Sequence, residues 1–132
     1  MPNEMILPEG WPRPKGYSQA VAGQGRTVCI AGQIGWNKDE VFVSDDFVDQ
    51  TAQAFRNIRD ILAAAGGSPE HLARLTWYVT DKQEYLSSLK EVGAAYRGVF
   101  GAVFPAMAVV EVTALMEDQA KIEIEATAII PD

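Results

Sequence analysis

Two segments of the chain repeat apolar residues at the spacing of an α-helix. The first repeat consists of Phe47, Thr51, Phe55, Ile58 and Leu62. These positions fall on one side of a helix and form a stripe that a protein core can bury. Ser44 precedes the stripe with a side chain suited to cap a helix, and the glycines at 66–67 can end it. The pattern predicts a helix between Ser44 and Gly66 with one buried face.

The second repeat follows a capping-box signature, in which Asp81 precedes Glu84 by three residues. Its apolar stripe consists of Tyr85, Leu89, Val92, Tyr96 and Val99. Gly101 lies just beyond the last of these positions and can terminate the helix. We therefore predict a second helix from about Asp81 to Gly101, and both helices can cover the same face of a sheet.

Five segments have the β-branched, aromatic or alternating composition of strands: residues 17–22, 27–31, 72–80, 107–115 and 121–130. The glycines at 23 and 25 can form a hairpin turn between the first two segments, and a short further strand is expected at 41–43. The polar residues 116–119 can join the last two segments. The order ββαβαββ predicts an α+β fold, a mixed sheet with two helices packed on one face.

The N-terminal segment has a different composition. Residues 1–16 contain four prolines and two glycines, which disfavour both helices and central strands. We expect an irregular arm there. A length of 132 residues without internal repeats or low-complexity runs predicts a single domain spanning 1–132.

The two C-terminal strands differ in how their apolar residues alternate. In the last strand Ile122 and Ile124 share one face, while Glu123 and Glu125 share the other. Residues 107–115 are instead mostly apolar on both faces, which is typical of a strand covered on both sides. Because two helices cannot cover both faces of one sheet, we expect identical subunits to bury the second face in a closed homo-oligomer.

Charge and composition narrow the possible ligands and location. The net charge is −7 with scattered basic residues, which disfavours a nucleic-acid partner. No apolar run approaches the roughly 20 residues that cross a bilayer, so no membrane partner is expected. Cys29 is the only cysteine, and the N-terminus has no secretory pattern, so the expected location is the cytoplasm.

Few residues offer catalytic chemistry. One histidine, His71, and one cysteine cannot supply a soft metal site, and no glycine-rich phosphate loop is present, so neither a metal nor a cofactor is expected. Glu111, Glu123 and Glu125 lie in apolar strands, where a carboxylate can act as a general acid or base. The alternative is that these acids are solvated or paired with Lys121 or an arginine.

Several short motifs are spread over the whole chain. They are residues 17–20 (YSQA), 31–34 (AGQI), 105–106 (PA), 110–112 (VEV) and 121–126 (KIEIEA), with 50–51, 57–58 and 64–66 in the first helix. Together these motifs resemble the reactive intermediate deaminase (Rid, or YjgF-like) family. Each motif is weak alone, and their combination is specific. The resemblance implies a chorismate-mutase-like fold, a homotrimer and ligand clefts between neighbouring subunits.

The resemblance also assigns roles to individual residues. It implies that Tyr17 lines the cleft and that Glu123 positions a hydrolytic water. Deaminating members have an arginine directly after Pro-Ala that binds the carboxylate of a 2-imino acid, and here that position is Met107. The family's usual asparagine late in the second helix aligns with Gly93.

Further positions that the resemblance places at the cleft are also apolar in this chain. Ala31, beside Gly32, replaces a serine, and Val109 replaces a cysteine. With Met107 and a nearby aromatic such as Trp36, these residues favour a more hydrophobic and less acidic ligand than 2-imino acids. The alternative is that Met107, Trp36 and Trp77 serve only packing.

Three functions follow from these observations. The first is hydrolytic deamination of an enamine or imine, with Glu123 activating water and Tyr17 orienting the substrate. The second is a non-catalytic trimer that binds a small molecule or regulates a partner through the same cleft. The third, the ribonuclease activity sometimes attached to this family, fits poorly with a pI near 4.6 and one histidine.

Overall fold

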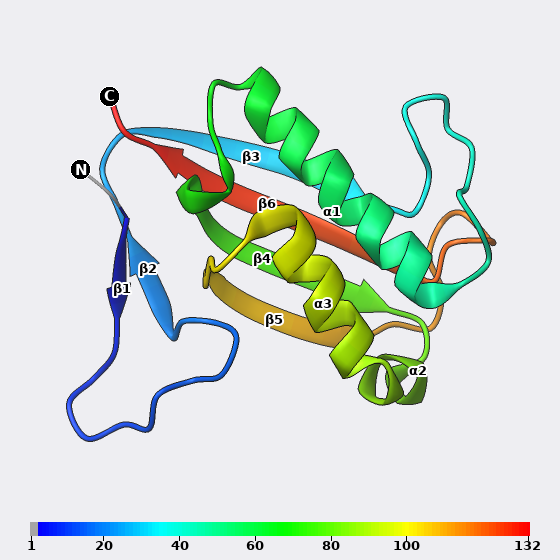
Figure 1. Cartoon of the computed structure of the whole chain (residues 1–132), viewed down its shortest axis with the longest axis horizontal. Helices are drawn as coiled ribbons and strands as arrows, with labels where there is room; N and C mark the ends of the chain where they lie inside the picture. Colours follow the sequence, from blue (N-terminus) through cyan, green and yellow to red (C-terminus); the bar gives the residue numbers. More distant parts are fainter. Residues whose placement is uncertain (1–2) are drawn as a thin grey trace.

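A four-stranded sheet forms one layer of the molecule, and the helices form the other (Figure 1). The computed structural model describes residues 3–132. In chain order the elements are β1 (Glu4–Ile6), β2 (Ala20–Ala22), β3 (Arg26–Gln33), α1 (Phe47–Ala64), the 3₁₀ turn η1 (Pro69–His71), β4 (Leu72–Val79), α2 (Lys82–Ser87), α3 (Leu89–Phe100), β5 (Ala106–Glu111) and β6 (Ile122–Ile130).

The order of strands in the main sheet is β3-β6-β4-β5. β4 and β5 are parallel, whereas β6 is antiparallel to both β3 and β4. In Figure 1, α1 crosses β3 and β6 and α3 crosses β4 and β5, both on the same face. The α+β class with a mixed sheet and helices on one face is thus confirmed. The last two strands are not hairpin neighbours, however, because β4 lies between them.

The N-terminal region departs from the sequence prediction. β1 pairs antiparallel with β2, with Glu4 opposite Ala22, so part of the expected irregular arm is a strand; residues 1–2 lie outside the described part. β2 therefore does not form a hairpin with β3, whose partner is β6. Residues 41–43 contribute only an isolated bridge between Phe42 and Trp36. The pairings of β1 with β2 and of β3 with β6 join segments that are not adjacent in the sequence, which local composition does not reveal.

The first helix forms as its stripe predicts, since all five stripe residues are buried. Its cap is Asp46 and not Ser44: the Asp46 carboxylate accepts a hydrogen bond from the Asp49 backbone N–H at 2.9 Å. Ser44 supports that cap, because its hydroxyl oxygen accepts from the backbone N–H of Asp46 at 3.0 Å. Gly66, with φ +86°, follows the helix end. Two cap-forming side chains therefore define this N-terminus.

The second helix is interrupted and forms two elements. Asp81 caps α2 by accepting hydrogen bonds from two backbone N–H groups, at Gln83 and Glu84. Ser88 then leaves helical geometry, with φ −114° and ψ 11°, and α3 begins at the next residue. As a result Leu89, a stripe position, is 50% exposed. The break changes the direction of the chain before α3 crosses the sheet (Figure 1).

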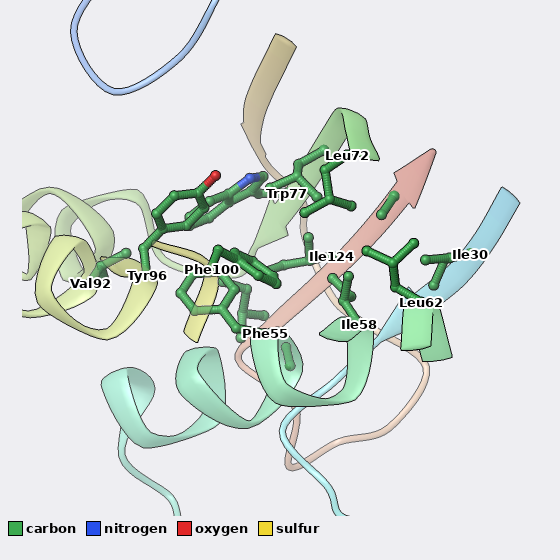
Figure 2. Packing of buried hydrophobic residues seen from close by; sticks show 14 of the residues in the cluster. Ile30, Phe55, Ile58, Leu62, Leu72, Trp77, Val92, Tyr96, Phe100 and Ile124 are labelled. Carbon is green, nitrogen blue, oxygen red and sulfur yellow. The ribbon is translucent and has the colours of Figure 1, made fainter. Parts of the chain in front are cut away.

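Aromatic rings fill the space between the helices and the sheet (Figure 2). Phe55 of α1 lies at the centre, with ring centroids 5.4 Å from Trp77, 5.4 Å from Tyr96 and 5.3 Å from Phe100. The Trp77 and Tyr96 contacts are edge-to-face, which adds a specific geometry to hydrophobic burial. This cluster joins α1, α3 and β4 and holds α3 above the sheet.

One buried polar residue connects the other end of α1 to two loops. Gln50 is fully buried, and its amide nitrogen donates to the carbonyls of Ser44 and Gln119, each at 3.0 Å. Its amide oxygen accepts from the Lys121 backbone N–H at 2.9 Å. Gly35 packs against this side chain, because a Cβ there would fall 2.4 Å from the Gln50 Cβ. The residue thus positions the start of β6.

We predict that Gln50→Leu lowers the free energy of unfolding by about 2–3 kcal/mol, because it leaves three backbone groups without partners in a buried site. Gln53→Leu is the matched control, since Gln53 lies on the same helix and its hydrogen bonds stay within α1. Urea denaturation of both variants measures the difference. Equal stability of the two variants would contradict the role given to Gln50.

Candidate functional site

A cavity of about 630 Å³ opens between α3 and the β5 edge of the sheet. Its wall is mainly apolar and aromatic and includes Trp77, Tyr85 and Tyr96. Met107 and Val109 of β5 form part of this wall. Residues two apart in a strand share one face, and here that face is turned toward the helices. In the sheet Met107 pairs with Leu75, and Val109 pairs with Trp77. Both residues, which the resemblance places at a cleft between subunits, thus line a cavity of the single chain.

Tyr17 lines the same cavity, and the hydrogen bonds of the next residue, Ser18, hold it there. Ser18 is buried, its backbone N–H donates to the Pro105 carbonyl at 3.1 Å, and its hydroxyl donates to the Phe104 carbonyl. Ser18 also forms a parallel bridge with Ala106 at the start of β5. Tyr17, 37% exposed, consequently stands at the mouth of the cavity beside β5.

Burial determines the hydrogen bonding and the protonation of the aromatic side chains in the wall. The Tyr96 hydroxyl donates to the Val103 carbonyl at 2.7 Å, and burial raises the pKa of Tyr96 far above its usual value. Burial also raises the pKa of Tyr85, so both phenols are neutral at physiological pH. Trp77 is 4% exposed, and its buried Nε1–H has no hydrogen-bond partner in residues 3–132. The wall therefore contains a buried donor that none of residues 3–132 satisfies.

Glu123 lies on the opposite face of the sheet. Its neighbours Ile122 and Ile124 point to the core, and Glu123 is paired across the strands with Tyr78 on the face without helices. Its carboxylate rests over Gly32, where an added Cβ would fall 2.2 Å from Glu123 Oε2. The pairing of β3 with β6 shifts register between Ile30 and Gln33, so Ala31 and Gly32 form a bulge beside the carboxylate.

The other strand acids have structural partners. Glu111 accepts a hydrogen bond from the Lys82 backbone N–H at 2.8 Å, at the start of α2. Glu125 accepts from the Tyr78 hydroxyl at 2.8 Å, and this hydrogen bond raises the pKa of Tyr78. Within residues 3–132, Glu123 is the member of this trio whose carboxylate forms neither a hydrogen bond nor a salt bridge. It is the acid free to contact a water or substrate.

Trp36 does not belong to the cavity wall of the single chain. Its ring packs on Phe42 with centroids 5.7 Å apart, and its backbone carbonyl accepts from Asn57 Nδ2 at 2.8 Å. His71 is also occupied locally, since its Nδ1 accepts from the Ser68 backbone N–H at 3.0 Å. The described part of the chain contains no cluster of three or more potential metal-ligating side chains. No helix among the described residues is long and apolar enough to span a membrane.

Sequence reasoning missed part of the cavity wall. Trp77 was assigned to packing, and Tyr85 and Tyr96 were assigned to a buried stripe, yet all three also face the cavity. Lys15 and Arg97 line the cavity as well, and neither stood out in the sequence. The register of β4 against β5 places Trp77 beside Val109. Only this register indicates that the aromatic residues share a site with Met107.

The fold and site together define a small α+β protein with an apolar cavity on one face of its sheet and a free carboxylate on the other. Residues 12–130 match the family described as endoribonuclease L-PSP. The chain belongs to this family, which is also known as the YjgF/RidA family. This result confirms the resemblance seen in the sequence motifs.

Individual relatives agree with this assignment. A RutC family protein of Pyrococcus horikoshii is 42% identical over 127 residues, covering 95% of this chain and 96% of the relative. Human 2-iminobutanoate/2-iminopropanoate deaminase is 36% identical over 114 residues, covering 86% and 79%. The crystal structure of YyfB from Yersinia pestis, a Rid family protein of unknown function, is 34% identical, with a TM-score of 0.87 and coverage of 98% and 100%.

The contact between Gly32 and Glu123 gives a stability prediction. Gly32→Ala should lower the free energy of unfolding by roughly 1–3 kcal/mol, because its Cβ overlaps the Glu123 carboxylate and the side-chain carbons behind it. In a Glu123→Ala background the same substitution should cost little. A double-mutant cycle by urea denaturation measures the coupling. Additive effects would show that the two residues do not share this space.

Proposed function

We propose that the protein is a hydrolytic deaminase of imines or enamines that acts as a homotrimer, with each reaction centre formed between two copies. The observation that carries the proposal is the free carboxylate of Glu123 held over the Gly32 bulge. Relatives named 2-iminobutanoate/2-iminopropanoate deaminase, from human and Salmonella typhimurium, are 36% and 34% identical to this chain and support the reaction class.

The need for two copies follows from the sheet. Within one chain the cavity of Tyr17, Met107 and Val109 opens on the helix face, and Glu123 lies on the other face. A sheet one layer thick has no passage between its faces, so a substrate cannot contact both groups of one chain. The face away from the helices also leaves Val110 44% exposed, an apolar surface that a neighbouring copy can bury. A closed trimer satisfies both requirements.

In the proposed reaction Glu123 removes a proton from a water molecule as the water oxygen attacks the carbon of the C=N bond. The π electrons of that bond move to nitrogen, which takes up a proton from solvent. Glu123 then passes its proton to nitrogen, and the hydroxyl loses its own proton to solvent as it collapses to a carbonyl and expels ammonia. The sum is one imine plus one water giving one carbonyl compound plus one ammonia, and an enamine enters the same route after tautomerising to its imine.

The apolar floor of the cavity sets the substrate preference in this proposal. Met107 and Val109 offer no hydrogen bond, and the aromatic residues around them favour a larger hydrophobic group than the short chains of iminobutanoate and iminopropanoate. A cytoplasmic location is part of the proposal, because a reactive imine must be hydrolysed where it is formed.

Replacement of Glu123 by Gln tests the mechanism. We expect Glu123→Gln to reduce kcat for ammonia release from freshly generated imines at least about 100-fold, because the amide cannot take the proton from water. Glu125→Gln, two residues along the same face, is the matched control and should retain activity. Turnover by Glu123→Gln equal to that of the control would remove the mechanism.

Restoring the family's arginine tests the substrate preference. Met107→Arg should increase kcat/KM for small 2-imino acids by about tenfold or more, since a charge-assisted pair with a carboxylate contributes roughly 1.5–3 kcal/mol. The parent protein should prefer imines and enamines with larger apolar groups. An unchanged preference in the folded variant, checked by thermal unfolding, would show that position 107 does not contact the substrate.

The second candidate is a non-catalytic trimer that binds a small molecule or a partner enzyme through the same cleft. The apolar residues Ala31, Met107 and Val109, where the resemblance implies polar ones, favour it. Ligand-induced thermal stabilisation without ammonia release from a broad imine panel would support this function over the first. The family's description as an endoribonuclease is disfavoured here by the net charge of −7.

A further inference from the structure

The charged side chains around the cavity are opposite in sign to the net charge of the chain. The protein has 18 acidic and 11 basic residues, yet the part of the lining formed by residues 3–132 contains two basic residues, Lys15 and Arg97, and no acidic one. The neutral phenols of Tyr85 and Tyr96 add no negative charge. An apolar cavity with a purely basic rim, in an otherwise acidic protein, is suited to an anion that carries a large hydrophobic group.

Arg97 is held at this rim by a glycine one helical turn earlier. Both residues are on α3, and a Cβ added at Gly93 would fall 3.3 Å from Arg97 Nη1. The guanidinium is therefore folded back along the helix over Gly93, toward the cavity that both residues line. Within residues 3–132 its side chain forms no hydrogen bond or salt bridge with the protein, so all its donors are available to a ligand.

A second donor lies deeper in the wall. The buried Nε1–H of Trp77 lacks a partner among the described residues, and an unsatisfied buried donor is uncommon in folded proteins. Trp77 lines the same cavity as Arg97. A ligand with an acceptor atom on its hydrophobic part would satisfy this donor, as would a bound water.

We propose that Arg97 binds the carboxylate of an aryl-sized apolar acid, so that the anion anchor comes from α3 and not from position 107 on β5. The inference deepens the proposed function: it keeps the acid group of a 2-imino acid and enlarges its hydrophobic part. Arg97 is then a substrate-binding residue, and Gly93 positions it by leaving room for the guanidinium.

Binding of unreactive probes tests the anchor without turnover. We would measure calorimetric affinities for 3-phenylpropanoate and its neutral isostere 3-phenylpropanamide. The parent protein should bind the acid more tightly, and Arg97→Gln should weaken acid binding roughly tenfold while leaving amide binding unchanged. Arg59→Gln, which removes one positive charge from α1 outside the cavity lining, should change neither affinity.

A pair of glycine variants separates positioning from stability. Gly93→Ala and Gly98→Ala both place alanine in α3 and should both raise the midpoint of thermal unfolding, because alanine favours helix over glycine. A Cβ at Gly98 has no atom within 4 Å, whereas one at Gly93 presses on Arg97. Only Gly93→Ala should weaken acid binding.

The outcomes are distinguishable from those of the deaminase proposal. Acid binding by Arg97→Gln as tight as that of the parent, or equal losses for acid and amide, would overturn the anchor even if ammonia release continues. Selective loss of acid binding supports the anchor even if no imine is hydrolysed, and in that case the site binds acids without deaminating them.

Discussion

The structure depends on one constraint: a sheet has two faces, and the helices of residues 3–132 cover only one of them. β6 lies inside the sheet, with Ile122 and Ile124 buried in the core on the helix side and with Glu123 on the other side. The core, the cavity beside α3 and the position of the carboxylate on the helix-free face all follow from that alternation. The proposal of a second copy rests on the same alternation, because Glu123 and the cavity residues lie on opposite faces of the sheet.

The sequence predicted those elements whose signals are local. The α1 stripe, the alternation of β6 and the Asp81 cap each depend on residues within a few positions of one another, and each is present in the structure. Pairing across long distances was predicted poorly. Gly25 illustrates the reason: it was expected to form a hairpin turn, but its φ of +141° lets the chain approach the carbonyl of Ile130, where a Cβ would fall 2.1 Å away.

For the candidate site, too, the sequence identified local motifs but not how they are arranged in space. The motifs identified Tyr17, Met107 and Val109, which meet at the cavity, and Gly32 with Glu123, which touch on the other face. No motif could show that these two groups lie on opposite sides of one sheet. Arg97 was not predicted either, because the sequence pattern of an exposed arginine on a helix is that of solvated surface. Its contact with Gly93 and the basic rim of the cavity are visible only in the structure.

The claim that each reaction centre combines two copies is tested most directly by mixing two inactive variants. Glu123→Gln removes the carboxylate, and Met107→Trp fills the cavity of an otherwise intact chain. If the centre lies between copies, randomly mixed trimers should regain roughly a quarter of parent ammonia release, because one interface in four pairs an intact cavity with an intact carboxylate. If mixed trimers form, as native mass spectrometry can verify, and remain inactive, cavity and carboxylate do not act across the interface and the account is wrong.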